Sequence, residues 1–281
     1  MAAAQTLTDR LRDDFAAAHP GLSSISSATR VLIGYPGKLL DEQYIMPDTL
    51  AVSLNTSDYF LAMTQLVRHQ RRMRFAQVGR PLSPDDSTGF QPLKPQLVGS
   101  RNENALLIPL AALQEPLIIP GSEAPAFSIF ATYGTAVLNL LAKVYWQEQA
   151  ATMPLLCFEA EFRKHLAENF QNIEFSGDLI NSVSIADALL TAEYSYRRWK
   201  DPNASHIERN LPIYRRMDVM EEFYVAAGTM YCSREGFQVG SFYEAVVNTA
   251  FSMSQDFTKH FGCRRGDPMY KQECMKNLVK N

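Results

Sequence analysis

Residues 185–199 read IADALLTAEYSYRRW, and this stretch decides the fold class because its apolar side chains recur at helical spacing. Ile185, Leu189 and Tyr196 would lie along one face of a single helix. The apolar pattern runs over the whole stretch without a proline or a glycine, so we expect a long helix with a buried face. The rest of the chain is interpreted outward from this element.

Patterns of the same kind predict several more helices on both sides of this stretch. They lie at 130–149, 159–169, 219–231 and 242–261, the last with an interruption near 252–254. A short amphipathic helix near the N-terminus and a helix at 57–75 with an arginine-rich face are also expected, whereas 105–110 is typical of a strand and 79–99 of a loop. The sequence therefore predicts a mainly α protein with a few short β-strands.

Composition excludes several classes of function. The chain has 281 residues, 46% of them hydrophobic, which is enough for a packed core. Its net charge of −3 supplies no general basic field, so we expect no nucleic-acid partner. The apolar run at 136–146 is broken by Asn139 and Lys143, and charged residues interrupt the N-terminal 20 residues. We therefore expect no membrane insertion by this chain and no signal peptide within it.

The residues alone offer no convincing catalytic constellation. No two of the five histidines are spaced to share a helix face, and neither a Gly-x-Ser-x-Gly elbow nor a glycine-rich phosphate loop occurs. Glu161, His165 and Glu168 would share one helix face. A solvated salt-bridge face explains that cluster better than a metal site does, so the residues predict no metal and no cofactor.

Ordered blocks in the C-terminal half resemble the neprilysin-type zinc metallopeptidases, the family of neprilysin and endothelin-converting enzyme. IAD at 185–187 is similar to the family's Glu-Asn-Ile-Ala-Asp helix, and EFYVAAGTMYC at 222–232 to its Phe-Phe-x-x-Phe-Ala-Gln-x-Trp-Cys helix. DFTKHFGC at 256–263, followed by GDPMY at 266–270 and Cys274, resembles the family's C-terminal ending. This last block is the most specific part of the resemblance.

Earlier blocks follow in the same order. IGYP at 33–36 and RNE at 101–103 are similar to family segments, and Tyr133 with Gly134 stands where the family's zinc helix opens. The resemblance spans most of residues 30–274 but only the C-terminal half of a family member. It implies a gluzincin, or thermolysin-like, catalytic-domain architecture as in neprilysin, without the N-terminal half. We expect a single domain over 1–281, with a helix and loop at 1–28, a helical and short-strand part at 29–120, and a helical part at 121–281.

The positions that would bind zinc in this family are changed. By the resemblance, its His-Glu-x-x-His motif falls on AKVYW at 142–146, and its third ligand falls on Val183. Ala142, Trp146 and Val183 offer no lone pair to a metal, and Lys143 adds a positive charge. Asp187, the carboxylate that would orient a zinc-bound histidine, is kept, and the resemblance leaves it without a histidine. We therefore predict a catalytically inactive homologue without zinc.

Three interpretations of these changes remain open. In the first, the vestigial residues Ala142, Lys143, Trp146, Val183 and Asp187 belong to a filled core, and the protein is a non-catalytic binding or assembly subunit joined to another chain. In the second, the emptied cleft binds a peptide without cutting it, with Lys143 contacting a carboxylate. In the third, displaced ligands preserve an active metallopeptidase.

The cysteines and sequons complete the expectations that follow from the resemblance. The family's pairing implies a disulfide between Cys157 and Cys274, whereas the family partners of Cys232 and Cys263 lie in the half that this chain lacks. Those two either pair with each other, stay as thiols or bond a second chain, which could supply the missing half. Asn55 and Asn203 stand in candidate N-glycosylation sequons. The resemblance thus implies an extracellular or secretory-pathway location.

Overall fold

The computed structural model describes most of the helical part of the chain and parts of the remainder. The described residues are 2–19, 30–33, 57–76, 78–79, 97–100, 105–109, 112–114, 117, 125–148, 153–169, 179–201, 217–232 and 237–271. Most of them lie in helices, so the expectation of a mainly α fold is confirmed.

Each predicted helical stretch contains a helix, although those predicted to begin at 159, 185 and 242 begin at 153, 179 and 237. In chain order the described helices are α1 Ala2–Ala18, α3 Tyr59–Ala76, α4 Ala126–Ile129, the π-helical turn η4 Phe130–Gly134, α5 Thr135–Glu148, α6 Met153–Asn169, α7 Leu179–Lys200, α8 Val219–Thr229, α9 Phe237–Ser252 and α10 Gln255–His260. The helix predicted at 130–149 is present, but it opens with η4. The interruption predicted near 252–254 is the break between α9 and α10, where Ser254 caps α10 by accepting from the Phe257 amide.

Three short strands form a small mixed sheet in the order β1-β3-β2. Strand β1 (Arg30–Ile33) pairs in parallel with β3 (Ala105–Ile108), and β2 (Val98–Ser100) pairs antiparallel with β3. The prediction of a loop over 79–99 was therefore wrong at its last two residues, which belong to β2. A glycine inside a three-residue strand hides the alternation by which strands are recognised.

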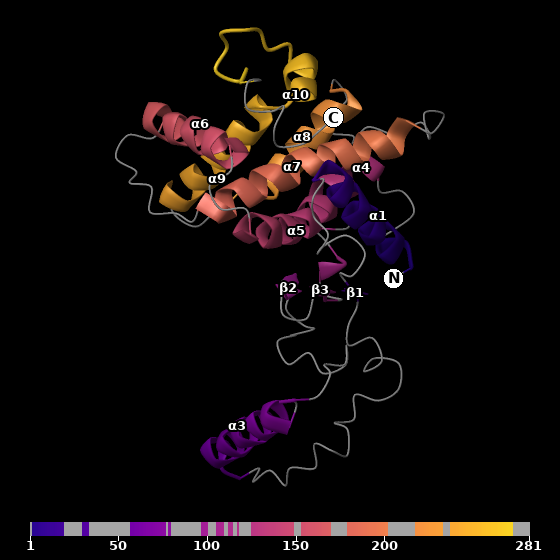
Figure 1. The fold of residues 1–281 in the computed structure, drawn as a ribbon, viewed down its shortest axis with the longest axis vertical. Helices are drawn as coiled ribbons and strands as arrows, with labels where there is room; N and C mark the ends of the chain where they lie inside the picture. Colours follow the sequence, from indigo (N-terminus) through magenta and orange to yellow (C-terminus); the bar gives the residue numbers. More distant parts are fainter. Residues whose placement is uncertain are drawn as a thin grey trace.

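The core lies around α7, between this helix and the helices α1, α5 and α9 that pack against it. Helix α7 packs along α5 on one side and against α9 on another, and α1 lies across both α5 and α7 (Figure 1). The largest fully buried side chains include Phe15 of α1, Tyr133 of η4 and Tyr196 of α7. The stretch IADALLTAEYSYRRW thus forms the centre of the fold, because eleven of its fifteen side chains are buried.

One helical stretch, Ala126–Gln147, is long and apolar enough to cross a membrane by length and composition alone. In the structure 61% of its apolar window is buried inside the protein. Val137, Leu138 and Leu141 lie in the hydrophobic core. The composition of this stretch is therefore that of a central core helix, which passes the same test.

Helix α3 is separate from this body. Figure 1 shows it at the far end of the long axis of the molecule, away from α5, α7 and α9. Its large apolar side chains are exposed, with Phe60 at 81% and Phe75 at 77%. A surface helix with this exposure leaves apolar side chains in contact with solvent.

Candidate functional site

At the position that resembles the family's zinc site, the carboxylate of Asp187 is buried among polar and aromatic side chains. Asp187 is fully buried on α7, and Trp146 on α5 donates its indole Nε1–H to Asp187 Oδ2 at 2.9 Å. Thr191, one turn along α7, donates to Oδ1 at 3.1 Å. Because a buried carboxylate without donors is costly, these bonds explain how Asp187 is kept in the core without a metal.

The third partner of Asp187 is His19, which the resemblance did not indicate. His19 lies just after α1, with Nε2 3.0 Å from Asp187 Oδ2 and Nδ1 2.9 Å from the Phe15 carbonyl oxygen. The first contact is an ion pair and not an aligned hydrogen bond, because Nε2 makes no hydrogen bond. The histidines of the family's motif are absent at 142 and 146, but a different histidine reaches Asp187 from the N-terminal helix.

The ring of His19 is fixed between aromatic neighbours. It stacks on Phe15 with centroids 4.2 Å apart and meets the edge of Tyr145 at 4.8 Å. Burial alone would lower the pKa of His19, but the negative charge of Asp187 and the hydrogen bond to the Phe15 carbonyl outweigh it. The net result is a raised pKa, because Asp187 stabilises the charged form of the ring.

The vestigial positions do not fit a zinc ion. Ala142 and Val183 are fully buried in the hydrophobic core and carry no donor atom. Trp146 and Asp187 are in direct contact at 2.9 Å, which leaves no space for an ion between them. The described residues contain no group of three His, Cys, Asp or Glu side chains that could hold a metal. Both oxygens of Asp187 are already used by protein groups.

The groove that the peptide-binding interpretation requires is not open beside Ala142 and Val183. Ala142 and Val183 are both 0% exposed, and α1 packs against the two helices that carry them. Lys143 is half-buried on α5. Neither position is therefore accessible to a peptide.

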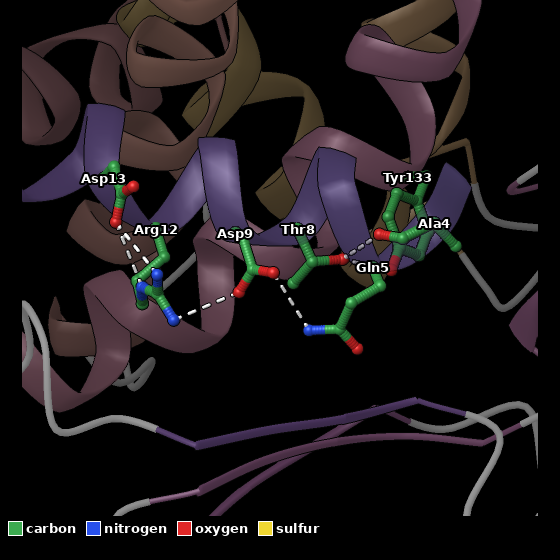
Figure 2. Close-up of polar contacts among 7 residues, drawn as sticks. All are labelled: Ala4, Gln5, Thr8, Asp9, Arg12, Asp13 and Tyr133. Carbon is green, nitrogen blue, oxygen red and sulfur yellow. Dashed lines mark hydrogen bonds and ion pairs between the residues drawn. The ribbon is translucent and has the colours of Figure 1, made fainter. Parts of the chain in front are cut away.

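Two further contacts fix α1 in this position. Thr8 Oγ1 and the Tyr133 hydroxyl of η4 lie 2.7 Å apart in a buried hydrogen bond, shown in Figure 2. Asp14 is buried against α7, where it accepts a hydrogen bond from Ser195 and pairs with Arg198 Nη1 at 2.8 Å. The same view shows an exposed pair, Arg12 with Asp13, on the outer face of α1. Polar anchors at the start, middle and end of α1 therefore specify one docked register.

The cysteine predictions are met only in part by described residues. Cys157 on α6 is disulfide-bonded, and its predicted partner Cys274 lies outside the described residues. Cys232 and Cys263 are free thiols, so they do not pair with each other. Cys232 is exposed and lines a pocket of about 370 Å³ together with Tyr231 and Tyr243. The candidate glycosylation residues Asn55 and Asn203 lie outside the described residues.

The face formed by Glu161, His165 and Glu168 is built from ion pairs. Lys271 Nζ lies 3.7 Å from Glu161, and Lys164 lies 3.9 Å from Glu168 on the same helix. All of these side chains are at least partly exposed. The interpretation as a solvated salt-bridge face accounts for this cluster.

One signal in the sequence could have identified His19. Leu11, Phe15 and His19 follow one another at intervals of four, so the histidine shares the apolar face of α1. A histidine on a buried helical face needs a buried partner, and Asp187 is an acid in the middle of an apolar helix with the same need. Pairing them requires knowing that α1 lies across α7, which no local pattern shows.

Comparisons with known proteins place the fold but not the activity. No family model matches the sequence, and no curated protein matches it either. The structure is similar to a chain in the solved structure of the Haemonchus galactose-containing glycoprotein complex, with a TM-score of 0.75 and 17% sequence identity. The match covers 96% of this chain and 49% of that chain, so this chain spans about half the length of its structural neighbour. At this identity the likeness shows that the two share a fold.

Proposed function

We propose that this protein is a catalytically inactive, neprilysin-like peptidase homologue that acts as a non-catalytic assembly subunit in the extracellular space or secretory pathway. The proposed thermolysin-like ancestry rests on the ordered sequence blocks. The inactivity rests on the side chains at 142, 146 and 183, which cannot bind zinc. Without a metal-bound water or a base beside it, the hydrolytic mechanism of such an enzyme has no nucleophile.

The observation that carries the assembly role is the surface of α3. Most of the large exposed apolar side chains in the described part of the chain lie on α3 or just after it: Tyr59, Phe60, Leu61, Met63, Val67, Phe75 and Val78. Monomeric proteins rarely expose apolar side chains in such a concentration. A surface of this composition is typical of the core of a protein–protein interface.

The charge on α3 indicates the chemistry of the partner. The helix carries four arginines and no acidic residue in YFLAMTQLVRHQRRMRFA. Arg68, Arg71 and Arg72 are exposed, and no ion pair from the described residues reaches them. The complementary surface is therefore apolar with acidic residues around it, and we assign it to a second polypeptide chain.

Two other observations support this proposal. The structural neighbour has about twice the length of this chain and belongs, by its description, to a glycoprotein complex. A disulfide at Cys157 fits an oxidising compartment, and the exposed thiol of Cys232 is available for a covalent link to another chain.

The test is site-specific photocrosslinking in the cells that make the protein. A benzoylphenylalanine at Phe60 should trap a second, different polypeptide, whereas the same probe at Leu156, an exposed apolar residue of α6, should not. Reversing charge with Arg68→Glu, Arg71→Glu and Arg72→Glu should abolish the adduct. Adducts only to lipid or only to another copy of this chain, or no adduct at all, would overturn the proposal.

Two alternative functions are separated by simpler measurements. An active metallopeptidase requires zinc, so elemental analysis of the native protein showing no stoichiometric zinc would exclude that alternative. A stand-alone peptide binder requires an open cleft, and the complete burial of Ala142 and Val183 disfavours it.

A further inference from the structure

The contacts of His19 give its protonation state a structural consequence. Its two ring nitrogens face two acceptors, the Phe15 carbonyl oxygen at 2.9 Å and Asp187 Oδ2 at 3.0 Å. A neutral imidazole has one N–H donor and one lone pair. Either neutral tautomer therefore places a lone pair beside one of the two oxygens, and only the imidazolium has an N–H on both sides and a charge that attracts Asp187.

We propose that His19 is a pH-sensitive latch that holds the last turn of α1 over the buried Asp187 cluster. At acidic to neutral pH the charged ring ties α1 to α7. When the ring loses its proton, the charge attraction to Asp187 is lost and a lone pair lies beside one of the two oxygens, so the last turn of α1 loosens. This opens the covered surface around Tyr145 and Asp187, which goes beyond the assembly role proposed for α3.

The groups that face His19 make this behaviour specific to the histidine. From α7 the facing charge is Asp187, which remains tied to Trp146 and Thr191 whether or not His19 is protonated. From α5 the facing group is Tyr145, whose pKa is raised by burial and then by Asp187, so its hydroxyl stays neutral. One turn earlier on α1, Asp14 is paired with Arg10 and Arg198. His19 is therefore the group that changes charge near neutral pH.

The direction of the effect follows from the raised pKa of His19. A group whose pKa is higher in the docked state than when free contributes stability that is fully present below the free pKa, near 6.5. That contribution is lost as the pH rises through the docked pKa. The latch is thus closed at pH 6 and released on the alkaline side.

The other anchors of α1 limit the motion to one turn. The Thr8–Tyr133 hydrogen bond involves groups that do not titrate near neutral pH, because burial raises the pKa of Tyr133 to about 12. Asp14 keeps its contacts with Ser195 and Arg198. The first three turns should therefore remain docked when the last turn is released, which supplies an internal control.

The experiment measures backbone amide protection factors by NMR between pH 6 and pH 9. Protection of the amides of residues 15–19 should fall by about tenfold for each unit by which the pKa of His19 exceeds that of a free histidine. Amides of residues 8–12 should keep constant protection. His19→Gln should remove the dependence, whereas His260→Gln, which alters an exposed pair with Asp218, should leave it intact.

A direct titration keeps the proposal falsifiable if His19→Gln folds poorly. The imidazole C–H resonances of His19 in the unaltered protein should report a pKa above 6.5, and Asp187→Asn should lower it. A pKa at or below 6.5, an equal loss of protection in residues 8–12, or a fall that persists in His19→Gln would each overturn the latch.

Discussion

The indole nitrogen of Trp146 lies 2.9 Å from Oδ2 of Asp187, so two positions that resemble a ligand site and its orienting carboxylate bond directly to each other. Where a family member would place a histidine, a metal and water, this chain places one aromatic donor that reaches the carboxylate. The bond gives the buried carboxylate of Asp187 a hydrogen-bond donor within the core.

Replacing Trp146 tests this contact. Trp146→Phe removes the donor while keeping an aromatic ring, and it should lower the free energy of unfolding by about 1 to 3 kcal/mol because a buried carboxylate loses a hydrogen bond. Urea denaturation measures the change. In a double-mutant cycle with Asp187→Asn the two effects should couple by at least about 1 kcal/mol. Additive effects would show that the bond contributes nothing.

Glu193 should make stability depend on pH. It is fully buried on α7, and burial raises its pKa from 4.5 to about 7, despite the hydrogen bond from Ser254 at 2.7 Å and the charge of Arg197. Because the raised pKa favours the protonated form, its stabilising effect is complete below pH 4.5 and is lost as the pH rises through about 7.

The matching variant is Glu193→Gln. Relative to Glu193→Gln, the unaltered protein should lose up to about 3 kcal/mol of unfolding free energy between pH 4.5 and pH 8. Denaturation curves at several pH values give the difference, in which the contributions of the other titrating groups cancel. A difference that does not vary with pH would contradict the assignment.

The capping box of α8 predicts a smaller effect at the surface. Asp218 accepts from the backbone amides of Met220 and Glu221, and Glu221 accepts from the Asp218 amide. Asp218→Ala should cost about 1 kcal/mol, and Asp218→Asn should recover most of it because an amide oxygen also caps a helix. Thermal unfolding followed by circular dichroism measures both variants. Equal losses for the two would indicate that the ion pair with His260, and not the cap, is responsible.

The disulfide at Cys157 predicts a redox-dependent stability. Cys157→Ser should lower the free energy of unfolding by about 2 to 5 kcal/mol, as for native disulfides of small secreted domains. Adding a reductant should destabilise the unaltered protein and leave Cys157→Ser unchanged. Cys232→Ser, which changes an exposed free thiol, is the control and should unfold as the unaltered protein does. A reductant effect that survives in Cys157→Ser would place the bond elsewhere.

Local sequence patterns were sufficient to locate the main helices. The apolar periodicity of α7, the break before Ser254 and the helical run around Leu138 can all be recognised along the chain, because a helix buries a face defined by residues three and four apart. Strand β2 could not be recognised, since three residues that include a glycine show no alternation. The π-turn at η4 also has no local signal that separates it from an α-helix.

The sequence by itself determined the helical fold class and the lack of metal-binding side chains at 142, 146 and 183, because periodicity and donor chemistry are properties of the residues. Only the tertiary structure decided that His19 meets Asp187 across 168 positions of chain, that Ala142 and Val183 are completely buried, and that the apolar side chains of α3 face solvent. These contacts join segments far apart in sequence, and their energies depend on burial, which a linear pattern does not contain.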